Sequence, residues 1–126
     1  MSPSPMPPSL ISWFEIPVDD LERAKKFYDT IFDINIDIQD FGEFKMGIFP
    51  FDQVGGALVK NEYYKTGKQG PMIYLNANPD LKTVQERIEG AGGTIMIHKR
   101  QISPEHGYMA VFSDTEGNRL ALHSDK

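Results

Sequence analysis

Apolar and polar positions along the chain follow the period of a strand and then the period of a helix. The run from Leu10 to Val18 predicts a β-strand whose core face carries Phe14, Ile16 and Val18. The apolar residues that come next have the three- and four-residue spacing of one helix face: Leu21, Ala24, Tyr28 and Ile31. Asp19 and Asp20 are N-cap candidates for this helix, and Glu22 follows Asp19 at the spacing of a capping box.

The second half of the chain repeats this order of patterns. A strand-like run from Pro71 to Asn76 precedes a helix whose apolar stripe has the same spacing: Leu81, Val84, Ile88 and Ala91. Three short strand-like runs follow each predicted helix, at 34–39, 44–49 and 54–60 and then at 94–99, 108–114 and 119–123. Gly117 lies between the last two runs and suits a tight hairpin turn. The order strand, helix, three strands therefore occurs twice.

This pattern predicts an α+β fold built from two βαβββ modules. Each module is a small curved sheet with a helix on its convex side, so the two concave faces form an incomplete barrel around a cavity, with the helices on the outside. We expect a flexible proline-rich tail at 1–9 and a single domain at 10–126. Within the domain, module one spans 10–60, a linker spans 61–70 and module two spans 71–124.

Composition narrows the possible functions. A chain of 126 residues is long enough for one hydrophobic core. Its net charge of −5 argues against a nucleic-acid binder that neutralises phosphates. It has no cysteine, which excludes disulfides and thiolate chemistry. Because no apolar run could span a bilayer and the N-terminal residues do not resemble a signal peptide, we expect a cytoplasmic protein that does not bind membranes.

Three segments resemble the vicinal oxygen chelate superfamily: WFEIPVDDLERAKKFY, GGALVK and GYMAVFSDTEGNRLALHS. That superfamily includes glyoxalase I, extradiol dioxygenases, fosfomycin-resistance enzymes and bleomycin-resistance proteins, and the chain is most similar to its small bacterial glyoxalase-like proteins. The resemblance implies the two-module fold and a homodimer. It does not imply one reaction, because this fold carries many chemistries.

The metal ligands that the resemblance implies are missing from the matching positions. These positions fall on Trp13, on or beside Met72, on Ala121, and near Ala57 or Leu58. Tryptophan, alanine and leucine offer no lone pair to a hard or borderline cation, and one methionine sulfur alone does not make a site. We therefore predict that the chain lacks the inherited metal site and uses no cofactor.

Strand alternation places other side chains on the cavity face. Glu15 shares a face with Trp13, and His123 shares one with Ala121. Tyr74 and Asn76 stand in the same relation to Met72. The predicted ligand-binding residues are therefore Trp13, Met72, Tyr74, Asn76 and Ala121, with Glu15 and His123 as candidate catalytic residues. An apolar cavity with a few polar groups is typical of a small-molecule site.

A purely structural interpretation of the same residues is also open. Glu15 and His123 can pair with each other or with backbone where the first and last strands meet. Trp13 can serve packing, and Asn76 can simply end a strand before Pro79. Tyr63 and Tyr64 of the linker can cover the cavity or a partner interface.

Four functions remain open from the sequence. The favoured one is a metal-free protein that binds or sequesters a small planar or cationic molecule through Trp13 and Glu15. The second is a metal-independent lyase or isomerase in which Glu15 and His123 act as base and acid. The third is a relocated metal site made by Glu15, His123 and a loop carboxylate such as Glu43. The last is a structural role with no ligand.

Overall fold

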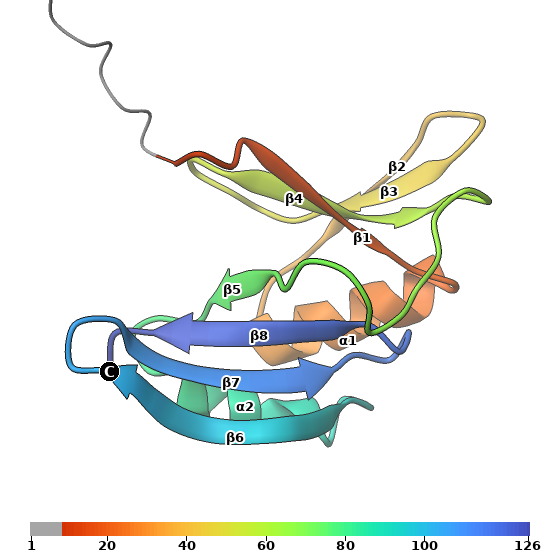
Figure 1. The fold of residues 1–126 in the computed structure, drawn as a ribbon. Coiled ribbons are helices and arrows are strands. Elements are labelled where there is room, and N and C mark those ends of the chain that lie inside the picture. Colours follow the sequence, from red (N-terminus) through yellow and green to blue (C-terminus); the bar gives the residue numbers. More distant parts are fainter. Residues whose placement is uncertain (1–8) are drawn as a thin grey trace, which may run out of the picture.

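The computed structural model describes residues 9–126, so the predicted tail at 1–9 lies outside the described residues except for Ser9. Two modules with the same order of elements follow each other along the chain (Figure 1). The first consists of β1 (Trp13–Pro17), α1 (Leu21–Phe32), β2 (Asp37–Asp40), β3 (Lys45–Ile48) and β4 (Gly55–Lys60). The second consists of β5 (Tyr74–Asn76), α2 (Leu81–Ile88), β6 (Thr94–Ser103), β7 (Gly107–Ser113) and β8 (Arg119–Ser124).

Each module forms one mixed four-stranded sheet with the same topology. The strand orders are β1-β4-β3-β2 and β5-β8-β7-β6, with β1 parallel to β4, β5 parallel to β8, and the other pairs antiparallel. The predicted α+β fold with two βαβββ modules is therefore confirmed. Within residues 9–126 no strand pairing joins the two sheets, so they do not close into a barrel. In each sheet the first strand of the module, β1 or β5, lies at an edge.

Aspartates begin both helices. The Asp20 side chain accepts a hydrogen bond from the Arg23 amide at 3.0 Å, and the Asp80 side chain accepts one from the Lys82 amide at 2.9 Å. Such caps satisfy amides that have no partner inside the helix. The predicted apolar stripes are the buried faces, except that Ala91 follows the end of α2 and is only half-buried.

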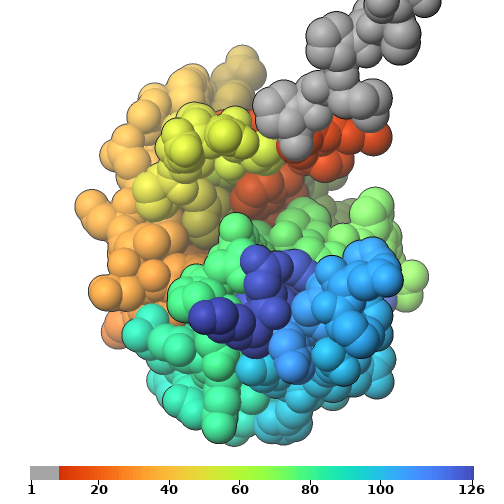
Figure 2. Space-filling model, turned by 90° about the vertical axis from the view of Figure 1, so that its left-hand side faces the viewer, coloured from red at the N-terminus to blue at the C-terminus, as the bar shows by residue number. Residues whose placement is uncertain are grey.

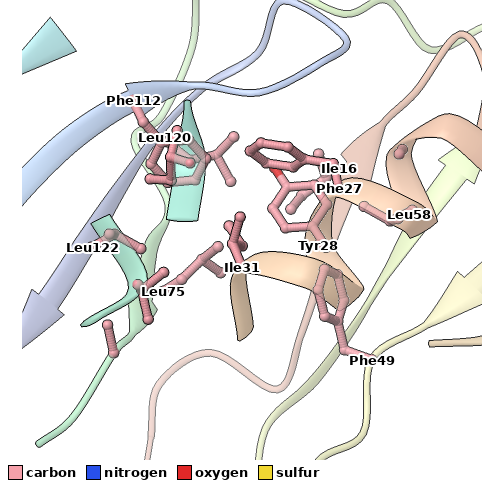
Figure 3. Close-up of a cluster of buried hydrophobic side chains, with 14 of the residues drawn as sticks. Ile16, Phe27, Tyr28, Ile31, Phe49, Leu58, Leu75, Phe112, Leu120 and Leu122 are labelled. Atoms are coloured by element: carbon pink, nitrogen blue, oxygen red, sulfur yellow. The ribbon is translucent and has the colours of Figure 1, made fainter. Parts of the chain in front are cut away.

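One hydrophobic core is shared by the two modules. In Figure 3, side chains of α1 such as Tyr28 and Ile31 lie between Phe49 and Leu58 of the first module and residues of the second, such as Leu75. The helices α1 and α2 contact each other, and the ring centroid of Phe27 on α1 lies 6.1 Å from that of Phe112 on β7. The modules are thus packed together through their helices and core side chains, without strand pairing between the two sheets.

A buried carboxylate in the turn between β7 and β8 joins the second module to the start of α1. Glu116 accepts hydrogen bonds from the amides of Asp19 and Asp20, at 3.0 and 2.8 Å, and from Nε and Nη2 of Arg23, at 2.7 and 2.9 Å. Its side chain is fully buried. Because the amino end of a helix carries partial positive charge, a carboxylate at this position is stabilising.

A second carboxylate of the same turn extends this junction. Asp114 accepts a hydrogen bond from the buried Tyr28 hydroxyl at 2.8 Å and others from the amides of Glu116 and Asn118. The Asn118 amide group in turn donates to the carbonyl of Pro17 at 2.7 Å. Burial raises the pKa of Tyr28 well above its ordinary value and also raises the pKa of Asp114. We call Arg23, Tyr28, Asp114, Glu116 and Asn118 the junction.

Replacing Glu116 with glutamine should destabilise the protein by about 2 kcal/mol at neutral pH, because charge-assisted hydrogen bonds become neutral ones. Burial alone would raise the pKa of Glu116, but the hydrogen bonds from Arg23 and the backbone outweigh burial and lower it. A carboxyl with a lowered pKa adds stability above its ordinary pKa and loses it as the pH falls through the folded-state pKa. Urea unfolding at neutral pH and near pH 3 measures both effects.

The matched control for this change is Glu86→Gln, on the exposed side of α2, which should leave stability nearly unchanged. The gap in unfolding free energy between wild type and Glu116→Gln should narrow in acid. Asp114 has a raised pKa, so its effect on the pH dependence of stability has the opposite sign. This effect is present in both proteins and largely cancels in the difference between their unfolding free energies. A gap that stays constant from neutral pH to about pH 3 would show that the charge of Glu116 does not stabilise the fold.

Candidate functional site

A groove of about 880 Å³ lies between the two modules. Figure 2 faces this side of the molecule and shows a recess between β1, in red, and β5, in green. Its lining is mostly apolar and comes from both modules, and it includes Trp13, Phe14, Phe32, Phe49, Met72 and Tyr74. Its size and composition fit a small-molecule site.

The groove is bordered by two strand edges whose backbone groups are not used within the sheets. The Val18 amide donates to Val59 on the β4 side, so by alternation the backbone groups of Trp13 and Glu15 point away from β4. On β5, Ala77 donates to His123 of β8, so the backbone groups of Tyr74 and Asn76 point away from β8. Both edges therefore offer donors and acceptors to whatever occupies the groove.

Aromatic rings approach the first sheet closely here because two glycines leave room for them. A Cβ atom added to Gly56 would lie 2.3 Å from the ring of Phe14, and one added to Gly55 would lie 2.8 Å from the indole of Trp13. Phe14 also packs against Phe49, with ring centroids 5.8 Å apart. The pair Gly55–Gly56 thus permits close approach of side chains to β4, as the sequence indicated.

Four of the predicted ligand-binding residues line this one groove: Trp13, Met72, Tyr74 and Asn76. Trp13 is 39% exposed and Tyr74 is 50% exposed, so both rings are accessible. Asn76 accepts a hydrogen bond from the Asn78 amide at 2.9 Å, which fixes its side chain. The fifth, Ala121, has no exposed surface: it lies on a central strand in a small cluster with Met109 and Val111, and it does not reach the groove.

Glu15 is fixed by two aromatic side chains. One carboxylate oxygen accepts from the Tyr64 hydroxyl at 2.6 Å, and the other accepts from Nε1 of Trp13 at 3.3 Å. The hydrogen bond to Glu15 and the negative charge of that carboxylate raise the pKa of Tyr64. The linker that contains Tyr64 is thereby held against β1. Tyr63 and Tyr64 line a separate groove beside the β2–β3 hairpin, so neither covers the groove between the modules.

The structure does not bring Glu15 and His123 together. The Nε2 atom of His123 lies 2.6 Å from the carbonyl oxygen of His106. Glu15 lines a small pocket that also contains Arg119, at the start of β8, and His123 is four residues further along that strand, about 13 Å away. Their positions along the strands separate them. The predicted acid–base pair therefore does not form, and of the structural alternatives His123 adopts the one with backbone.

The positions that the metal enzymes of this fold use do not fit a metal here. Ala57 and Ala121 are fully buried, and neither carries a donor atom. Glu43 lies by a groove beside the β2–β3 hairpin, apart from Glu15 and His123, so the relocated set does not converge either. No cluster of three histidine, cysteine, aspartate or glutamate side chains suited to a metal occurs within residues 9–126.

Polar residues at the far end of the groove were not predicted as site residues. Asp80, Thr83 and Arg87 of α2 and its cap line this end. The hydrogen bond from Lys99, at 2.8 Å, and then that from the Lys82 amide lower the pKa of Asp80. Arg87 donates to the carbonyl of Ile31 on α1 at 3.2 Å. Nothing in the sequence marks them, because they reach the groove only through the packing of α2 against α1.

Known proteins share this architecture. Residues 11–46 match the family described as bleomycin resistance protein-like N-terminal. A glyoxylase-like domain-containing protein of Didymella fabae is 32% identical over 117 residues, which cover 89% of this chain and 91% of that protein.

Solved structures show the same fold at lower identity. A glyoxalase/bleomycin resistance protein from Albidiferax ferrireducens has a TM-score of 0.72 at 19% identity, over 90% of this chain and 97% of that one. A glyoxalase I mutant from Zea mays has a TM-score of 0.70 at 18% identity, over 90% of this chain and 45% of that one.

The paired βαβββ modules with a groove between their edges define a glyoxalase-like domain. The chain belongs to the vicinal oxygen chelate superfamily, among its glyoxalase-like and bleomycin-resistance-like members. The resemblance seen in the sequence is thus confirmed. No helix of the described residues has the length and apolar character needed to cross a bilayer.

The contact between Tyr64 and Glu15 can be tested by titration. Replacing Glu15 with glutamine should lower the pKa of Tyr64 towards its ordinary value, because the hydrogen bond to a charged acceptor and the neighbouring negative charge are both lost. The tyrosinate absorbance of each protein, minus that of its Tyr64→Phe counterpart, isolates Tyr64 among the five tyrosines. The exposed neighbour Glu62 provides the control Glu62→Gln. Identical titration curves for wild type and Glu15→Gln would contradict the contact.

Proposed function

We propose that this protein binds a small, largely apolar and planar organic molecule in the groove between its modules. The observation that carries the proposal is the convergence of Trp13, Met72, Tyr74 and Asn76 on one apolar groove of about 880 Å³. This volume lies within the range of sites that enclose drug-sized ligands, roughly 300–1,000 Å³. The exposed rings of Trp13 and Tyr74 offer stacking surfaces on opposite edges.

The contacts favour binding over acid–base catalysis. A general base must lie within hydrogen-bonding reach of the proton that it removes, and its partner acid must share the site. Here Glu15 has both oxygens engaged by Tyr64 and Trp13, and His123 lines neither the groove nor the small pocket beside Glu15. Because Glu15 is engaged in this way, the structure gives no support to a cationic ligand. Of the two predicted ligand types, planar and cationic, we therefore retain the planar one.

We also propose a homodimer. Apolar side chains at the edges and loops of the first module are exposed, including Ile11, Trp13, Phe41 and Phe51. Exposed apolar groups next to unpaired strand edges are commonly covered by a partner. Two further statements remain predictions: that the protein acts in the cytoplasm, and that it binds no nucleic acid.

Ligand binding can be followed directly, because Trp13 is the single tryptophan of the chain. Titration with a panel of aromatic metabolites and antibiotics should change the emission of Trp13 for those that bind, with isothermal titration calorimetry as confirmation. Tyr74→Ala should weaken binding of such a ligand about tenfold, because one stacking surface is lost while the fold keeps its core.

The control for this variant is Tyr63→Ala. Tyr63 is 81% exposed and lies outside the groove, so its removal should leave the affinity unchanged. An equal loss of affinity in both variants would place the ligand elsewhere. Turnover of a bound ligand, abolished in Glu15→Gln, would replace the binding proposal by the catalytic one.

A further inference from the structure

A smaller pocket of about 270 Å³ adjoins the groove. Pro71 and Ile73 line both spaces, and β1 runs from one to the other, with Trp13 at the groove and Glu15 at the pocket. The pocket therefore continues the groove towards the end of β1. Its lining combines apolar residues with five charged or polar ones: Glu15, Lys65, Gln69, Asn118 and Arg119.

The guanidinium of Arg119 is only partly satisfied by the protein. Nη2 donates to the carbonyl of Gly70 at 2.9 Å. Nε is buried and has no acceptor, and it is the one buried side-chain nitrogen or oxygen in residues 9–126 of which this is true. No carboxylate of the described residues lies within 4.0 Å of the guanidinium. An arginine has five N–H donors and no acceptor, and among the described residues only the Gly70 carbonyl accepts from this one.

The acid in the same pocket forms no ion pair with Arg119. Both oxygens of Glu15 are held by Tyr64 and Trp13, so its hydrogen-bonding capacity is directed at the linker and at the indole. Lys65 adds a second positive charge to the lining. Against the single negative charge of Glu15, the two cations leave the lining with a net positive charge, which favours an anion even in a chain whose net charge is −5.

We propose that Arg119 and Lys65 bind the carboxylate of an organic acid whose apolar body lies in the groove. This proposal rests on the proposed function and names the class of ligand: an aryl or alkyl carboxylic acid. A guanidinium matches a carboxylate with two parallel N–H···O bonds, which fixes direction as well as adding affinity. The ligand would thus lie along β1, with its ring between Trp13 and Tyr74 and its charged end beyond Pro71.

A carboxylate fits this pocket better than a phosphate does. The pocket is small, and it offers one guanidinium and one ammonium group rather than a cluster of cations. Glu15 lies in the same lining, and its negative charge repels a dianion more strongly than a monoanion. The chemistry of the pocket therefore selects a single negative charge on a planar group.

The test compares each acid with its own primary amide, which keeps the shape and removes the charge. Calorimetry on the full chain would use a panel of arylalkyl and alkyl acids with their amides, such as 4-phenylbutyrate and 4-phenylbutanamide. We expect the acids to bind at least about tenfold more tightly than the amides. Arg119→Met should remove this preference and leave amide binding unchanged, and Arg119→Lys should keep part of it. The control is Arg100→Met, because Arg100 is exposed on β6, and this variant should keep the full preference for acids.

Each outcome decides a different point. Equal affinity of acids and amides for the wild type, which needs no variant, would overturn the carboxylate site and leave the proposed function standing. A preference that survives in Arg119→Met would remove Arg119 from the site. If neither acids nor amides bind, the carboxylate site fails, and the titration with aromatic metabolites and antibiotics then decides the proposed function separately. In the bound state the Nε–H resonance of Arg119 should shift when the acid is added and stay in place when the amide is added.

Discussion

The structure depends on one buried carboxylate, that of Glu116, at the amino end of α1. It lies in a turn of the second module but satisfies the backbone amides that open a helix of the first, and Arg23 supplies its counter-charge. A carboxylate with no exposed surface is costly unless it is fully paired, so the two modules cannot separate at this point without leaving it unsatisfied. Asp114 and Tyr28 extend the same constraint into the hydrophobic core.

The groove follows from this constraint together with the topology. In both modules the last strand returns parallel to the first, which leaves β1 and β5 at the sheet edges. The junction and the helices hold the modules together at a position where these edges border the groove instead of pairing. Unpaired strand edges are normally protected against association. Here they border an apolar space, where a ligand or a partner chain can complete them.

The elements and the faces of their side chains could be predicted from the sequence, but distances along and between strands could not. Trp13 and Tyr74 both line the groove, but so do Phe14 and Leu75 on the opposite strand faces, because the groove runs around the strand edges. Alternation could not place His123 relative to Glu15, since that depends on how the two sheets are offset. In the sequence, Glu116 is simply one residue of a predicted hairpin turn. Its role as a partner of the amides at the amino end of α1 depends on how the two modules pack.

Ionisable groups of this chain divide into those that the fold uses and those that it leaves available. Glu116 accepts hydrogen bonds from the backbone and from Arg23, and Asp114 accepts one from Tyr28. Glu15 accepts hydrogen bonds from Tyr64 and Trp13. Arg119 is different, because its only partner is a single carbonyl. Natural proteins leave few buried polar atoms without partners. In a fold whose buried acids are all hydrogen-bonded, the unpartnered Nε of Arg119 is therefore an exception. The negative charge that we propose for the ligand rests on this unsatisfied cation.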